Sequence, residues 1–119
     1  MSKILIVDDA SFVRMSLKKL LSSHGYTVVE ANNGVTAVQQ YTATKPDLVI
    51  MAITMPEMNG IDAVKAIKNL DNTAKIIMCS AMGQHKKVVA SIRAGALDFI
   101  VKPYEEEHIL NSIKKVLTI

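Results

Sequence analysis

The stretch DLVIMAITMPEMNG, residues 47–60, begins with a predicted strand, DLVIMA, and continues into a loop punctuated by Pro56 and Gly60. The run LVIM is apolar at every position, which is typical of a strand covered on both faces of a sheet. Such strands occur in parallel sheets with helices on both sides, so this stretch favours an α/β fold. The strand ends on Ala52, a methyl group with no chemistry, whereas neighbouring predicted strands run into polar residues.

Four further runs fit strands, and helical patterns separate them. The strand candidates are KILIV (3–7), YTVVE (26–30), KIIMC (75–79) and LDFIV (97–101). Apolar stripes at helical spacing lie between them, and Ser11 is the expected N-cap of the first helix. Strict alternation of strand and helix predicts a mostly parallel sheet with helices on both faces.

The order of the strands follows from their polarity. The runs ILIV, LVIM and IIMC are apolar throughout, whereas YTVVE and LDFIV carry polar residues and suit the edges of the sheet. We therefore predict a doubly wound, five-stranded parallel sheet of order 2-1-3-4-5, a flavodoxin-like (βα)5 fold.

Length and composition limit the function classes. A chain of 119 residues with 50% hydrophobic content fits one globular domain, residues 1–119. No apolar run is long enough to cross a membrane and no leader is apparent, so we expect a cytoplasmic protein. The single cysteine, Cys79, lies in an apolar run and suits a reducing compartment. A net charge of +3 without aromatic residues interleaved among the basic ones disfavours nucleic-acid binding.

Chemistry-bearing residues follow several of the predicted strands. The first strand runs into Asp8 and Asp9, the fourth into Ser80, and the fifth into Lys102. Ligands of doubly wound sheets bind outside the carboxyl ends of the strands. The acidic pair suits Mg²⁺, and the hydroxyl and the ammonium suit phosphate-like oxygens. Each signal alone is weak, but their coincidence at matching strand ends predicts a site for a small anionic group bridged to a metal.

Four motifs resemble the receiver domain of two-component response regulators. They are VDDA (7–10), ITMPEMNG (53–60), CSAMG (79–83) and AGALDFIVKP (94–103), and the resemblance covers essentially the whole chain. It implies that Asp8 and Asp9 hold Mg²⁺, with Asp9 as the direct ligand and the backbone carbonyl of Thr54 as another.

The resemblance also assigns roles near the last strand. It implies that Ser80 and Lys102 contact a phosphoryl group. It implies that Phe99 is the aromatic residue that changes rotamer when the hydroxyl residue moves, and that the peptide bond before Pro103 is cis.

The departure from the family pattern is at Ala52. Receivers have an Asp at this position that accepts a phosphoryl group from a histidine kinase, and a methyl group offers no nucleophile. We therefore expect no self-phosphotransfer, no other enzymatic activity, weakened Mg²⁺ binding and a chain held in the inactive state. Two explanations stay open: a natural pseudo-receiver that binds without phosphorylation, or an active receiver whose acceptor was replaced. We favour the second, because the auxiliary residues of the site are still present.

The resemblance extends to output and partners. The short chain and the phrases CSAMGQ and ITMPEMNG are most similar to chemotaxis regulators, which suggests a stand-alone, monomeric protein-binding switch. The expected partners are a histidine kinase as phosphodonor and a flagellar switch protein or a phosphatase. The switch protein or the phosphatase would bind through the helix that begins in 83–89, the strand 97–101 and the closing helix. A phosphorelay carrier is an alternative.

Two rivals from other classes fit less well. A haloacid-dehalogenase-type phosphotransferase needs a second acid two residues after its nucleophile, but Asp8 is followed by Asp9 and Ala10. A flavin-binding module needs a phosphate loop rich in glycine and hydroxyl groups after the first strand, and VDDASF would repel phosphate.

Overall fold

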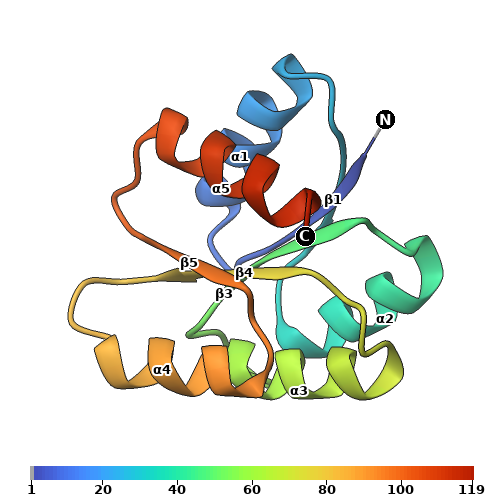
Figure 1. The fold of residues 1–119 in the computed structure, drawn as a ribbon, viewed down its shortest axis with the longest axis vertical. Helices are drawn as coiled ribbons and strands as arrows, with labels where there is room; N and C mark the ends of the chain where they lie inside the picture. Colours follow the sequence, from blue (N-terminus) through green and yellow to red (C-terminus); the bar gives the residue numbers. More distant parts are fainter. Residues whose placement is uncertain (1) are drawn as a thin grey trace.

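The computed structural model describes residues 2–119 and is built around a five-stranded parallel sheet (Figure 1). The sheet order is β2-β1-β3-β4-β5, which confirms the predicted doubly wound topology. The strands are β1 (Lys3–Val7), β2 (Thr27–Ala31), β3 (Leu48–Ala52), β4 (Ile76–Ser80) and β5 (Asp98–Val101).

Five helices alternate with the strands and cover both faces of the sheet. Helices α1 and α5 pack on one face, and α2, α3 and α4 pack on the other (Figure 1). The helices are α1 (Ser11–Ser23), α2 (Gly34–Thr44), α3 (Gly60–Leu70), α4 (His85–Ala94) and α5 (Glu106–Leu117). None of the helices within residues 2–119 is long and apolar enough to span a membrane.

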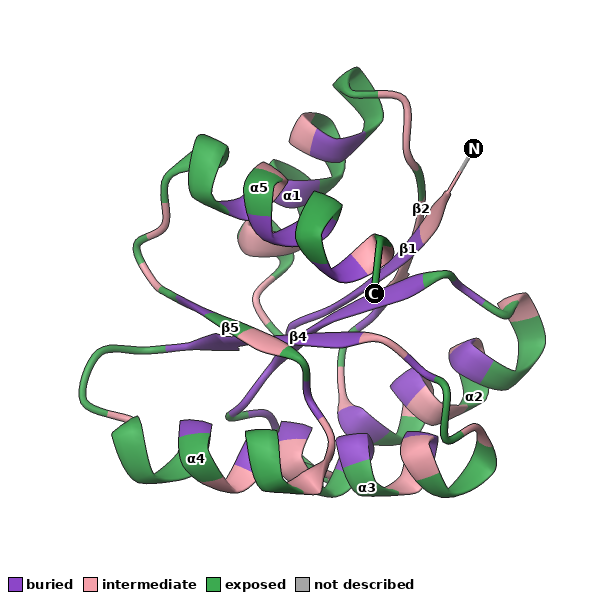
Figure 2. Ribbon diagram, in the orientation of Figure 1, coloured by how far each residue is buried: buried purple, intermediate pink, exposed green. Residues whose placement is uncertain are grey.

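The sheet separates two hydrophobic cores, because successive side chains of a strand point to opposite faces. In β4, Ile77 and Cys79 join the core under α1 and α5, whereas Ile76 and Met78 join the core under α2, α3 and α4. The three inner strands are buried along nearly their whole length, as Figure 2 shows for β1 and β4. The edge strands β2 and β5 are only partly buried, as their polar residues predicted.

Element boundaries differ from the predicted ones by small amounts. Four of the five strands begin one residue later than predicted, so Ser80 is the last residue of β4 rather than the residue after it. The prediction that Ser11 caps α1 is wrong. Ser11 is the first helical residue and Ala10 occupies the cap position, where the Ala10 N–H is bound by the Asp8 carboxylate at 2.9 Å. The Asp8 side chain therefore organises this turn.

A glycine brings the start of α3 against the end of β3. The Gly60 N–H donates to the Ile53 carbonyl at 2.7 Å, and a Cβ at position 60 would collide with the Ala52 carbonyl oxygen. Glycine is therefore required for this close approach. It holds the loop between residues 53 and 59 over the carboxyl edge of the sheet.

Candidate functional site

The carboxyl ends of four strands meet at one edge of the sheet. The registers pair Val7 with Met51, Ala52 with Cys79, and Ser80 with Val101. Asp8, Ala52, Ser80 and Lys102 are thereby brought to the same edge, as expected from the parallel topology. The predicted cluster is a real spatial cluster and not only a pattern in the sequence.

An ion pair lies at the centre of this edge. Lys102 Nζ donates to Asp8 Oδ2 at 2.7 Å, and the Asp8 side chain is only 4% exposed. The other carboxylate oxygen of Asp8 accepts the Ala10 N–H at 2.9 Å. A carboxylate this deeply buried needs such partners, since an unpaired buried charge is strongly unfavourable. Asp8 is thus held in one orientation.

Asp9 and Ala52 differ in accessibility. Asp9 is exposed, so its carboxylate faces solvent at the mouth of the site. Ala52 is 3% exposed and presents a methyl group between the ends of β1 and β4. Among residues 2–119 no group of three or more His, Cys, Asp or Glu side chains is arranged to hold a metal ion. The acids available to a metal here are the pair Asp8 and Asp9.

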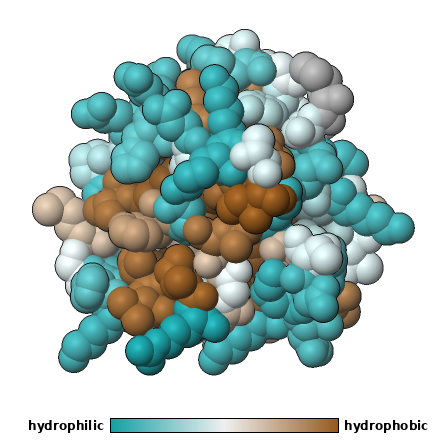
Figure 3. All heavy atoms as spheres, viewed as in Figure 1, coloured by the Kyte–Doolittle hydropathy of each residue, from teal (hydrophilic) through white to brown (hydrophobic). Residues whose placement is uncertain are grey.

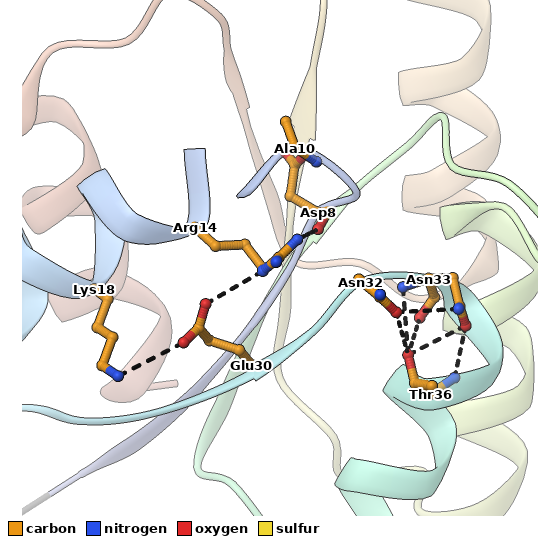
Figure 4. Close-up of polar contacts among 8 residues, drawn as sticks. All are labelled: Asp8, Ala10, Arg14, Lys18, Glu30, Asn32, Asn33 and Thr36. Atoms are coloured by element: carbon orange, nitrogen blue, oxygen red, sulfur yellow. Dashed lines mark hydrogen bonds and ion pairs between the residues drawn. The ribbon is translucent and has the colours of Figure 1, made fainter. Parts of the chain in front are cut away.

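Arg14 hydrogen-bonds to the backbone of the acidic pair, Asp8 and Asp9, and this role was not predicted from the sequence. Its Nη1 donates to the Asp8 carbonyl at 2.6 Å, and its Nε bonds Glu30 Oε1 on β2 at 3.2 Å (Figure 4). Lys18 adds a longer contact to Glu30 at 3.6 Å. The guanidinium therefore fixes the peptide between Asp8 and Asp9 against the neighbouring strand.

A second missed residue, Gln84, joins two loops across the site. Its Oε1 accepts the Ala81 N–H at 2.6 Å, and its Nε2 donates to Thr54 Oγ1 at 2.9 Å. The β4–α4 loop is thereby tied to the β3–α3 loop. The sequence does indicate that Gln84 directly precedes α4, where a side chain is expected to cap the helix. The spacing of residues along the chain does not indicate that its partners are Ala81 and Thr54.

The thiol and phenol near the site are held in their neutral forms. Burial raises the pKa of Cys79 to about 12; Lys102 opposes this shift and Asp8 adds to it. Burial also raises the pKa of Tyr104, with smaller contributions from Cys79 and Asp8. Cys79 is fully buried in the sheet, so it is a packing residue and not a nucleophile.

The end of β5 presents apolar side chains to solvent. Phe99 is 41% exposed and Val101 39% exposed, and Ile92 of the adjacent α4 is 42% exposed. Figure 3 shows apolar side chains gathered across the middle of this face, between α4 and α5. The Lys102–Pro103 peptide bond that follows is cis.

A shallow pocket of about 540 Å³ opens beside the ion pair. Asp8, Asp9 and Lys102 line it on the site side, and Phe12 and Tyr104 line it on the other. It gives a small solute access to the acidic pair from the side of α1.

Taken together, the fold and this edge define a class: a doubly wound domain with a buried aspartate paired to a lysine, and a hydroxyl, at its strand ends. A model of the response regulator receiver domain matches residues 4–114 of the chain. The chain therefore belongs to the response regulator receiver family, as the sequence motifs indicated.

Relatives place the chain within this family. The chemotaxis protein CheY of Thermotoga maritima is 55% identical over 115 residues, which cover 96% of each chain. The chemotaxis protein CheY of Bacillus subtilis is 56% identical over 116 residues, or 97% of each. A solved structure of a putative response regulator from Chloroflexus aurantiacus superimposes with a TM-score of 0.94 at 32% identity, covering 99% of this chain and 98% of that one. The chain is a CheY-like receiver domain.

Proposed function

We propose that this chain is a chemotaxis-type response regulator receiver, a protein-binding switch that Ala52 prevents from being phosphorylated. The observation that carries the proposal is the buried Asp8 carboxylate, paired with the part-buried Lys102 beside Ser80 at the strand ends where Ala52 presents a methyl group. A charged pair of this kind contributes little net stability, so its retention favours a chemical role. Without a nucleophile at residue 52, the chain stays in its inactive conformation and performs no self-phosphotransfer or other enzymatic reaction.

In the form with an aspartate at position 52, the chemistry is phosphoryl transfer. The carboxylate oxygen attacks the phosphorus of a phosphohistidine, an O–P bond forms, and the N–P bond breaks with the electron pair returning to the imidazole. Lys102, released from Asp8, neutralises charge on the phosphoryl oxygens, and Ser80 donates its hydroxyl to one of them. Phe99 then moves inward from its half-exposed position as the Ser80 segment shifts.

The residues present fit a weak Mg²⁺ site. Asp9 is exposed and free to bind directly, and Asp8 lies beside it. Together with the backbone carbonyl of Thr54 and several waters they would supply an all-oxygen set of ligands, which is what Mg²⁺ prefers. The bound ion would supply charge neutralisation at the phosphoryl group. Two carboxylates and one ammonium leave one negative charge at this site, and an Asp at position 52 would make it two, so Ala52 weakens the affinity.

The proposed partners follow from the relatives and from the exposed apolar face. A histidine kinase would be the phosphodonor of the unaltered form. A flagellar switch protein or a phosphatase would bind α4, β5 and α5, where Ile92, Phe99 and Val101 are exposed. Relatives named as chemotaxis proteins support this pathway, and the buried reduced thiol of Cys79 suits the cytoplasm.

Phosphorylation of the restored acceptor tests this function. The chain is incubated with Mg²⁺ and acetyl phosphate, and the intact mass is measured. We expect no adduct on this chain and one phosphoryl adduct on Ala52→Asp. An adduct on the Ala52 chain, or its absence on the aspartate variant, would contradict the proposal.

A natural pseudo-receiver is the alternative function. It predicts that partner binding does not depend on residue 52, whereas a switch predicts that Ala52→Asp binds its partner more tightly after phosphorylation. A pull-down that compares the two chains, with and without acetyl phosphate, distinguishes them. A phosphorelay carrier would instead pass the phosphoryl group of Ala52→Asp on to a second histidine protein.

A further inference from the structure

The carboxamide of Gln84 lies between the two loops that follow β3 and β4. It accepts a hydrogen bond from the Ala81 backbone at 2.6 Å and donates one to Thr54 at 2.9 Å. Thr54 and Gln84 are 30 residues apart in the sequence and belong to different loops. The side chain therefore closes the mouth of the site from one loop to the other.

The direction of this side chain is unusual for its position. Gln84 is the N-cap residue of α4, yet its side chain makes no capping bond to that helix. The first turn of α4 is left to His85, Lys86 and Lys87, and the two lysine charges are unfavourable at a helix N-terminus. The Gln84 side chain thus makes its two hydrogen bonds to Ala81 and Thr54 at the site and none to the backbone of α4.

The Ala81 N–H is placed where an anion at position 52 would bind. It directly follows Ser80 at the end of β4, and β4 is paired with β3 so that Cys79 lies opposite Ala52. Backbone N–H groups at such strand ends are typical donors to bound oxyanions. In this structure the donor is already satisfied by Gln84.

We infer that Gln84 is a positioning residue that competes with the phosphoryl group for the Ala81 N–H and so holds the receiver in its inactive conformation. An anion that binds at the end of β3 displaces the Gln84 oxygen from this donor. The bond to Thr54 is then lost as well, because one carboxamide makes both. This inference rests on the proposed function and adds the residue that opposes activation.

The surrounding loop allows this displacement. Gly83 has a φ of +83°, and a Cβ there would meet nothing within 4 Å, so no neighbouring atom packs against this side of Gly83, the residue before Gln84. Only Val88 and Ser91 of α4 are buried. Release of Gln84 therefore frees the start of α4, which borders the apolar face of β5.

The first experiment measures the hydrogen bond on this chain without any phosphoryl chemistry. Amide exchange of Ala81 is followed by NMR in Gln84→Met, which keeps the length of the side chain but not its bonds. We expect exchange to be about two- to tenfold faster, the range set by the net worth of one hydrogen bond. The control Gln39→Met changes an exposed glutamine of α2 and should leave Ala81 unchanged. Unchanged exchange in Gln84→Met overturns the inference.

The second experiment measures the competition in Ala52→Asp with Mg²⁺. Affinity for beryllofluoride, a tetrahedral phosphoryl mimic that binds to carboxylates, is determined by calorimetry. Adding Gln84→Met should tighten binding about two- to tenfold, because the Ala81 donor is free. Adding Gln84→Glu should weaken it, because the carboxylate still accepts from Ala81 and brings negative charge.

The outcomes separate the two proposals. If Ala52→Asp itself does not bind beryllofluoride, the proposed function fails together with the competition, while the exchange measurement still decides whether the bond exists. If Ala52→Asp binds and Gln84→Met binds equally or more weakly, only the role of Gln84 is overturned.

Discussion

Helices α4 and α5 border β5 from opposite faces of the sheet but are held in different ways (Figure 1). In α5 the buried residues are Ile109, Ser112, Ile113 and Val116. The hydroxyl of Ser112 donates to Asp98 on β5 at 2.6 Å, and Lys115 reaches the same carboxylate oxygen at 3.0 Å. Acidic residues begin α5 and lysines end it, in agreement with its dipole.

Helix α4 buries fewer residues than α5. Its buried residues are Val88 and Ser91, and the Ser91 hydroxyl bonds the Lys87 carbonyl of its own helix at 2.8 Å. Lys86 and Lys87 oppose the dipole in its first turn. This difference in packing and charge indicates that α5 is held rigidly against the sheet and that α4 is the helix that can move. A switch beside β5 requires one such mobile element.

The largest expected effect on the free energy of unfolding comes from truncating a buried side chain of α5. Ile113 is fully buried, so Ile113→Ala should lower the free energy of unfolding by about 2–5 kcal/mol through lost burial and a cavity. Urea unfolding followed by circular dichroism measures this.

The same substitution, Val→Ala, can be made in each of the two helices, so that the groups removed are identical and only the packing differs. Val116→Ala in α5 should cost about 2–3 kcal/mol, since each buried methyl contributes about 0.8 kcal/mol and a cavity adds to it. Val88→Ala in α4 should cost clearly less, because a weakly held helix relaxes around the change. Equal costs for the two valines would remove the contrast between the helices.

The two buried serines give the next effect. Ser112→Ala removes a hydrogen bond to a charged carboxylate on another element and should cost about 1.5–3 kcal/mol. Ser91→Ala removes a bond within its own helix and should be nearly neutral, because alanine favours the helix. The pair is matched, since Ser112 is 4% and Ser91 0% exposed.

The Ser112 effect should depend on pH. Burial alone would raise the pKa of Asp98, but hydrogen bonds from Ser112, Lys115 and the Phe99 N–H lower it below the ordinary 3.8. A lowered folded-state pKa contributes stability above the unfolded-state value, and this stability is lost as pH falls below it. The difference between Ser112→Ala and the parent should therefore shrink below about pH 4. A constant difference at lower pH would show that Asp98 is not the partner that matters.

The sheet and the clustering of the strand-end residues could both be predicted from the sequence, because both follow from the parallel arrangement of buried strands. Apolar runs such as LVIM reveal strands covered on both faces, and parallel strands carry Asp8, Ser80 and Lys102 to one edge whatever the loops do. The loops themselves were not predictable in this way. The Gln84–Thr54 and Arg14–Glu30 contacts join positions 30 and 16 residues apart and depend on rotamers. Ser11 failed as a cap because the Asp8 carboxylate already organises that turn.

The smallest expected effect concerns the helix dipoles. Lys86→Glu places negative charge in the first turn of α4 and should stabilise the chain by about 0.3–1 kcal/mol at low salt. Glu106→Lys reverses the favourable charge at the start of α5 and should destabilise it by a similar amount. Both effects should fade in about 1 M salt, where the screening length falls to about 3 Å. A gain for Lys86→Glu that persists at high salt would mean that the start of α4 is stabilised by a new contact and not by its dipole. The mobility inferred for this helix would then need another cause.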